Sequence, residues 1–161
     1  MIKLIKEIVE ESLYALDKYS DDSLTLVMRT GMAETGYKTI RQYGGGPALS
    51  YWQIEPATAH DIVDNYVSYR KRYKDALLHL GCNFEKLEFS LFSNIAVAAA
   101  FCRLQYLRYP KAIPSWDNME AQAKYWKTSY NTELGKGTIE HFMEANQDEE
   151  SLDGYIKDST T

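Results

Sequence analysis

The sequence contains few of the residues that build metal sites, disulfide frameworks or nucleic-acid surfaces. Two cysteines and three histidines occur in 161 residues, without the spacing of metal ligands, so no metal site is expected. Two cysteines cannot form a disulfide framework, and free buried thiols are expected instead. The longest basic run is Arg70-Lys71-Arg72, and the formal net charge is −5. Because nucleic-acid modules carry a basic face, nucleic acid is not expected as a partner.

Long apolar runs are also absent. The most apolar segment, residues 96–100, is too short to span a membrane and has polar flanks. Residues 1–19 start like a signal peptide, but three glutamates interrupt them and their apolar residues recur at helical spacing. This segment therefore predicts an amphipathic helix of the folded protein and no signal peptide.

What is present is typical of one helical domain. Hydrophobic residues make up 45% of the chain and only four prolines occur, which argues against disorder. Apolar periodicity and capping residues predict a mainly α fold, with at most a small β-hairpin or an extended loop between residues 36 and 54. We expect a single domain over residues 1–146 and an acidic, flexible tail over 147–161. The expected helices cover residues 1–19, 24–34, 56–63, 67–80, 84–109 with a break at 93–94, 117–130, and 138–145.

Residues 28–59 carry the chemistry of interest. Glu34 falls at or just beyond the last turn of an expected helix whose N-cap lies within residues 20–23. A Gly-rich loop at residues 44–47 then leads to Tyr51-Trp52-Gln53. Aromatic faces and amide groups suit a polyhydroxylated ligand. A carboxyl near a helix C-terminus, beside apolar neighbours, has a raised pKa, as a general acid requires. The alternative is an exposed helix-terminal glutamate. Three glycines without a following Lys-Ser/Thr do not predict a phosphate site.

Four segments resemble one known family. Glu34-Thr35-Gly36 and residues 50–59 (SYWQIEPATA) resemble the motifs of soluble lytic transglycosylases, which have a lysozyme-like fold. Residues 94–101 (NIAVAAAF) resemble the Asn-Ile helix of that family, and Ser129-Tyr130-Asn131 resembles its Ala-Tyr-Asn motif. The segments occur in the family's order and approximate spacing. The resemblance covers residues 24–132.

The resemblance implies a lysozyme-like helical domain that cleaves peptidoglycan without a cofactor. In this family a single glutamate protonates the oxygen of the MurNAc-GlcNAc β-1,4 bond. It then accepts the proton of the muramyl 6-hydroxyl, so that a 1,6-anhydro ring closes. Glu34 matches this catalytic residue. The residues that the resemblance implies for substrate binding are Thr35, Trp52, Gln53, Tyr130 and Asn131.

Several of these residues also have a purely structural interpretation. Gln53 could instead cap the helix that begins at Pro56, Trp52 could be a core residue, and Tyr130 could be a packed aromatic side chain. Thr35 stands where the family usually has serine and keeps the hydroxyl group.

Departures from the family pattern keep two other functions open. Glu55 adds a second carboxylate, which would allow a hydrolytic muramidase, although we expect it to be solvated on the outer face of its turn. Thr132-Glu133-Leu134 replaces the family's Ala-Gly-Pro, and the acidic charge is unfavourable for adsorption to anionic walls. A non-catalytic virion or assembly protein with a lysozyme-like fold is the other alternative.

The resemblance also bears on partners and location. An enzyme of this kind without an export signal is expected to be phage-encoded. It would reside in the host cytoplasm or the virion and reach the cell wall by lysis or delivery. The expected partners are peptidoglycan glycan strands and virion components.

Overall fold

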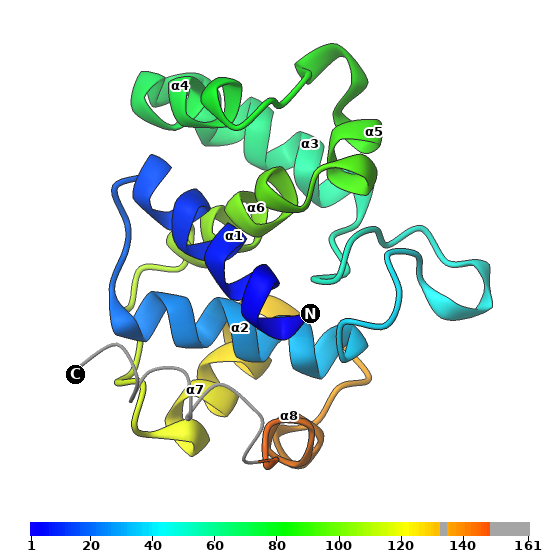
Figure 1. Ribbon diagram of the computed structural model, residues 1–161, viewed down its shortest axis with the longest axis vertical. Helices are drawn as coiled ribbons and strands as arrows, with labels where there is room; N and C mark the ends of the chain where they lie inside the picture. The colour runs from blue at the N-terminus through cyan, green and yellow to red at the C-terminus, as the bar shows by residue number, and fades with distance from the viewer. Residues whose placement is uncertain (133–134, 149–161) are drawn as a thin grey trace.

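The computed structural model describes residues 1–132 and 135–148 of the chain, and these residues form a helical fold (Figure 1). No β-strand occurs within these two ranges, so the predicted mainly α class is confirmed. Glu133, Leu134 and residues 149–161 of the predicted tail lie outside the described residues. The α-helices are α1 (Ile2–Ala15), α2 (Asp21–Thr35), α3 (Pro56–Asn65), α4 (Lys71–His79), α5 (Leu87–Ser93), α6 (Ile95–Leu107), α7 (Met119–Trp126) and α8 (Ile139–Ala145).

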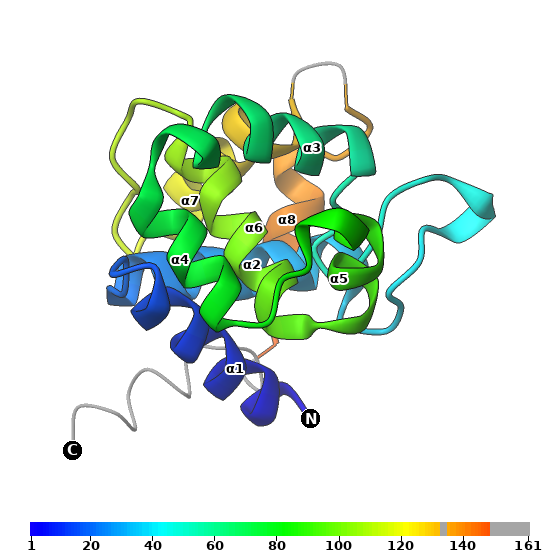
Figure 2. The ribbon, with the colours of Figure 1, turned by 90° about the horizontal axis from the view of Figure 1, so that it is seen from above.

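Helix α6 lies at the centre of the fold. It is the most apolar helix, and residues 97–104 along it are all buried. Helices α1, α2, α3 and α5 all pack against it, and Figure 2 shows it in the middle of the bundle. Its run of alanines allows neighbouring helices to approach closely, because a methyl group fills little space. The expected central helix is therefore confirmed.

The predicted break at residues 93–94 is confirmed and has a clear cause. The Asn94 side-chain oxygen accepts a hydrogen bond from the Val97 amide at 3.1 Å and so caps α6. Its side-chain nitrogen donates to the Leu80 carbonyl at 2.9 Å. The chain bends by 106° between the segments 84–93 and 95–107. Asn94 therefore fixes both the start of α6 and the direction of α5.

Membrane-span criteria are not met by any one helix in the described ranges, which is consistent with the sequence prediction. The bent pair of segments 84–93 and 95–107 meets the length and composition criteria only when both are counted together.

Helix α2 carries the predicted acid and is closed at both ends. Ser20 and Ser23 form a reciprocal capping box at its start, which confirms the predicted cap. At its end Gly36 adopts φ +59°, and its amide bonds to the Gly31 and Met32 carbonyls. The left-handed conformation favours glycine at this position. Glu34 is therefore placed in the last turn of a well-capped helix.

Two of the predicted helices differ from the observed ones for reasons that the backbone angles show. The first helix ends at Ala15 and not near Tyr19, because the backbone of Asp17 turns to φ +55°, a conformation that cannot continue a right-handed helix. The predicted helix over 67–80 is split into a 3₁₀ turn, Val67–Tyr69, and α4, because Arg70 between them has the extended angles φ −133° and ψ 84°.

The segment between α2 and α3 is a loop that several buried residues anchor to the core, Trp52 among them. Trp52 is 0% exposed, and its indole N–H donates to the Val27 carbonyl on α2 at 2.9 Å. The sequence predicts either a small β-hairpin or an extended loop here. Within the described residues this segment contains only two isolated β-bridges, which join Leu49 to Arg41 and to Ile54. The alternative of an extended loop is thus the observed one.

Tyr37 packs directly on α2, against Gly31 and Met28. It is fully buried, and its hydroxyl donates to the Met28 carbonyl at 2.7 Å. A Cβ atom placed on Gly31 would lie under 3.0 Å from the Tyr37 ring. Glycine at position 31 therefore makes room for the ring.

We predict that Gly31→Ala destabilises the protein despite the higher helix propensity of alanine. The propensity gain is about 1 kcal/mol, whereas overpacking against a fixed ring costs about 1–3 kcal/mol. Urea unfolding should show a net loss of free energy. In a Tyr37→Leu background the same change should cost less, and an equal loss in both backgrounds would exclude the steric explanation.

Candidate active site

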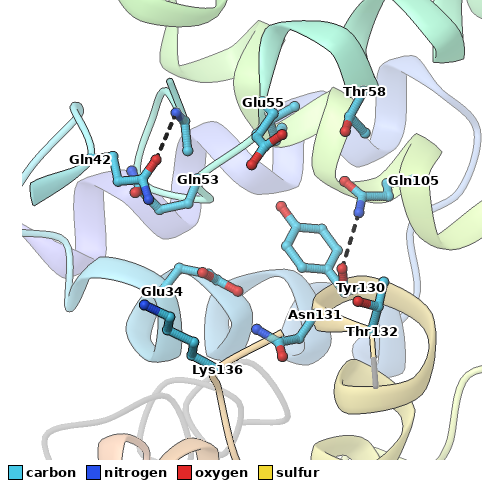
Figure 3. A pocket seen from close by; sticks show the side chains of 12 residues that line it. Glu34, Gln42, Gln53, Glu55, Thr58, Gln105, Tyr130, Asn131, Thr132 and Lys136 are labelled. Atoms are coloured by element: carbon cyan, nitrogen blue, oxygen red, sulfur yellow. Dashed lines mark hydrogen bonds between the residues drawn. The ribbon is translucent and has the colours of Figure 1, made fainter. Parts of the chain in front are cut away.

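Glu34 lies where two cavities adjoin. The larger one, here called the main cleft, has a volume of about 500 Å³, and the smaller one, the side cavity, about 350 Å³. Glu34 lines both, together with Gln42, Gln53, Asn131 and Lys136. Figure 3 shows the side chains of the main cleft, which come from α2, the loop after it, α3, α6 and the segment after α7. A ligand can therefore extend to either side of this carboxyl.

Burial makes the Glu34 carboxyl a proton donor near neutral pH. Loss of hydration raises its pKa from 4.5 to about 7, because an ionised carboxylate is poorly solvated in this position. Two groups oppose the rise: the Trp126 indole N–H donates to Oε1 at 3.1 Å, and His141 favours the anion electrostatically. The predicted upward shift in pKa is thus present, with burial as its largest cause.

Helices α7 and α8 build the wall behind Glu34. Trp126 ends α7 and is buried against Phe142, with ring centroids 5.2 Å apart. A ring nitrogen of His141 lies 2.7 Å from the Ala33 carbonyl, beside Glu34 on α2. The indole therefore reaches the carboxyl from a fixed position, and α8 is tied to the end of α2.

The remaining lining of the main cleft is rich in amide and hydroxyl groups. These groups are carried by Gln42, Gln53, Thr58, Gln105 and Asn131. Such groups hydrogen-bond the hydroxyl and N-acetyl groups of a sugar without needing a charge on it. The interior of the cleft therefore suits a polar, polyhydroxylated ligand.

Three predicted binding residues lie in the cleft with Glu34. Gln53 lines both cavities, and its side-chain nitrogen donates to the Ser50 carbonyl at 2.9 Å. Asn131 also lines both, and its side-chain oxygen accepts from Lys127 at 2.9 Å. Tyr130 lines the main cleft, although its hydroxyl donates to the Trp52 carbonyl at 2.6 Å and not to Glu34.

Two predicted binding residues do not lie in the cleft. Trp52 was predicted either as a cleft wall or as a core residue, and the wall assignment is wrong because its ring is completely buried. Thr35 is also buried, and its hydroxyl donates to the Tyr51 carbonyl at 2.8 Å. It therefore holds the following loop against α2, and the prediction that it binds substrate is wrong.

Glu55 occupies a different place from the one predicted. Its side chain is exposed to solvent as expected, but it lines the main cleft across from Glu34 and does not lie on the outer face of its turn (Figure 3). The residue directly precedes α3, where Pro56 starts the helix. The cleft thus contains a second carboxylate.

The Gly-rich loop, which we expected to form a cleft rim, does not itself line either cavity, although Tyr43 directly before it lines the side cavity. Gly44 and Gly45 have φ of +79° and +80°, as their predicted role in a turn requires. No atom lies within 4 Å of a Cβ built on either of them, so it is backbone conformation and not crowding that requires glycine. Tyr43 lines the side cavity and is 75% exposed. An exposed aromatic ring is thus available beside the cavity.

Some lining residues were missed by sequence reasoning. Gln105 is one of two strongly polar side chains on the mostly apolar α6, the other being Arg103, which is a signal that could have identified it. Gln42 and Thr58 carry no such signal, because nothing in their local sequence shows which way they point.

The functional groups of the site are the Glu34 carboxyl and the hydrogen-bonding side chains around it. In the described ranges no three His, Cys, Asp or Glu side chains gather as metal ligands would. Both cysteines are free and buried, as predicted. Comparisons with protein-family models, curated proteins and solved structures give no match to this chain. The resemblance to lytic transglycosylases therefore stays a prediction, and the function is inferred from the site itself.

We predict that Glu34→Gln stabilises the protein at alkaline pH. The folded-state pKa of Glu34, about 7, exceeds the unfolded value of 4.5. The contribution of Glu34 to stability is therefore highest below pH 4.5 and falls as the pH rises to 7 and above, where the half-buried carboxyl is ionised. Glutamine avoids this cost and retains an oxygen for the Trp126 N–H. Urea unfolding at pH 8 should show a gain of about 1–3 kcal/mol, which disappears at pH 4.

Glu55→Gln is the matched control, because it removes the same charge from an exposed position in the same cleft. It should change stability by less than about 0.5 kcal/mol at both pH values. An equal effect of the two substitutions would show that burial of Glu34 is not the cause.

Proposed function

We propose that the protein is a peptidoglycan lytic transglycosylase that cleaves the MurNAc-GlcNAc β-1,4 bond with Glu34. The observation that carries this proposal is a half-buried carboxyl, with a pKa of about 7, that lines two adjoining cavities. A group that protonates a glycosidic oxygen must lie between the binding sites of the two sugars it separates. The amide-rich lining supports a sugar as the ligand.

The proposed reaction uses Glu34 twice. The protonated carboxyl donates its proton to the glycosidic oxygen, and the bond between that oxygen and the muramyl C1 breaks. The resulting Glu34 carboxylate then accepts the proton of the muramyl 6-hydroxyl, whose oxygen bonds to C1 and closes the 1,6-anhydro ring. Glu34 thus ends in its starting protonation state. No water enters the products, because the muramyl 6-hydroxyl takes the place of water at C1.

The surroundings of Glu34 suit both steps. A pKa of about 7 keeps the acid and its conjugate base accessible at neutral pH, which is optimal for a group that must do both. When Glu34 has lost its proton, the Trp126 N–H stabilises the carboxylate by a charge-assisted hydrogen bond. Burial then favours return of the proton from the sugar hydroxyl. Burial and the indole hydrogen bond thus shift the pKa of Glu34 in opposite directions, and both protonation states are populated near neutral pH.

One observation favours a second candidate, a hydrolytic muramidase. Glu55 lies across the main cleft from Glu34 and is open to solvent. Inverting glycosidases use such a second carboxylate to activate the water that attacks C1. In that reaction Glu55 would accept the proton of water, and the product would carry a reducing end in place of the anhydro ring.

The two reactions are distinguished by mass spectrometry of the products released from purified sacculi. We predict anhydro-muropeptides from the wild type and a loss of about 10²–10⁴-fold in rate for Glu34→Gln, as expected for removal of a general acid. Glu55→Gln should retain activity within about threefold, because the loss of an exposed carboxylate that takes no part in the reaction changes the rate little.

Other outcomes would contradict the proposal. Reducing-end products that disappear in Glu55→Gln would establish the muramidase. Glycan binding by the wild type without any cleavage would instead favour a protein that has kept the cleft and lost turnover.

A further inference from the structure

The side cavity differs from the main cleft in one charged group of its lining. Lys136 and Glu34 line both cavities, but the main cleft adds the Glu55 carboxylate, whereas the side cavity adds His141. Apart from Glu34 and the Tyr43 phenol, the titratable side chains of the side cavity are therefore two basic ones, Lys136 and His141. This basic pair stands out in a chain whose formal net charge is −5. With Glu34 protonated, as its pKa near 7 allows, an anionic ligand group would meet an ammonium group at this position.

Lys136 is held in the cavity wall by close packing of its neighbours. A Cβ placed on Gly135 would lie under 3.0 Å from Asn131, and one placed on Gly137 would lie under 3.0 Å from Trp126 and Asn131. Only glycine allows the backbone on both sides of Lys136 to lie so close to these residues. The segment therefore rests directly on the residue that bonds Glu34.

The Lys136 ammonium group is available to a ligand. Its side chain is exposed, and within residues 1–132 and 135–148 it makes no hydrogen bond or ion pair. The nearby Lys127, by contrast, donates to the Asn131 side chain at 2.9 Å and to the Gly135 carbonyl at 2.8 Å. Lys127 thus has a structural role, and Figure 3 shows the Lys136 chain directed toward Glu34.

We propose that the side cavity binds the carboxylate of an acidic sugar and that Lys136 is its counter-ion. This inference rests on the proposed function. Since Glu34 touches the scissile bond, a group beside Lys136 belongs to a sugar adjoining that bond. In peptidoglycan the acidic group closest to the ring is the lactyl carboxylate of the muramyl sugar, which is ionised only when no peptide is attached to it.

The inference therefore assigns a substrate class and a preceding reaction. The preferred substrate is a glycan strand with free lactyl carboxylates. An amide hydrolysis that removes the stem peptides must supply this strand. Lys136 is then a specificity-determining residue, whereas Glu34 carries the chemistry.

The test compares ligands of equal length in the inactive Glu34→Gln background. The acidic ligand is a peptide-free GlcNAc-MurNAc oligosaccharide, and the neutral ligands are its carboxyl-reduced form and a chitooligosaccharide. By isothermal titration calorimetry, Lys136→Met should weaken binding of the acidic ligand about fivefold, the effect of one partly exposed charge pair. Binding of both neutral ligands should stay within twofold, and Lys136→Arg should retain most of the affinity for the acidic ligand.

Lys3→Met is the matched control, since Lys3 is exposed on α1 and lines neither cavity. It changes the net charge equally and should leave all affinities unchanged. High salt should weaken binding of the acidic ligand to the protein with Lys136 and have less effect on Lys136→Met. Equal losses for acidic and neutral ligands, or no loss for either, would overturn the role of Lys136.

The same experiment separates this inference from the proposed function. If the Glu34→Gln protein binds no glycan of either kind, the proposed function itself fails. If it binds both kinds and Lys136→Met does not discriminate between them, only the acidic-sugar site fails. A stem-bearing glycan that binds more tightly than the peptide-free one would also overturn the proposed preference.

Discussion

The partial burial of the Glu34 carboxyl is the constraint on which the rest of the structure depends. Glu34 is positioned by a capped helix, enclosed by the Trp126 indole and backed by α8 through His141. Neutral residues would pack in this place at lower cost, because a buried carboxylate is poorly solvated. A fold that retains an acid there carries a cost in stability at neutral pH, which is the pattern expected of a functional site.

The supporting structure keeps the carboxyl from escaping this environment. Trp52 locks the following loop onto α2, and the Tyr130 hydroxyl bonds the Trp52 carbonyl from the opposite side of the cleft. Tyr37 fills the space under α2 against Gly31. Because these aromatic side chains are buried and each is bonded to a backbone carbonyl, the last turn of α2 cannot easily rotate Glu34 into solvent. The polar lining is thus presented by a rigid frame.

Local signals predicted the parts of this arrangement that depend on neighbours in the chain. The helix cap within residues 20–23, the break at residues 93–94 and the place of Glu34 near a helix end all follow from short patterns. The roles of Trp52 and Thr35 did not follow, because their burial is decided by segments distant in the sequence. Lys136 gave no signal, since its position depends on how its flanking glycines pack against Trp126 and Asn131. Gln53 and Asn131, which the resemblance names as substrate-binding residues, line the cleft, and whether they bind a substrate stays a prediction.

The most direct test of the central claim is a titration of the Glu34 carboxyl carbon by NMR in the ligand-free protein. Assignment is made by comparison with Glu34→Gln, which lacks the signal. Burial, opposed by the indole hydrogen bond of Trp126 and by His141, predicts a pKa of about 7. A value near the ordinary 4.5 would mean that the carboxyl is ionised and solvated at neutral pH. In that case Glu34 could not serve as the acid, and the proposed mechanism would be wrong.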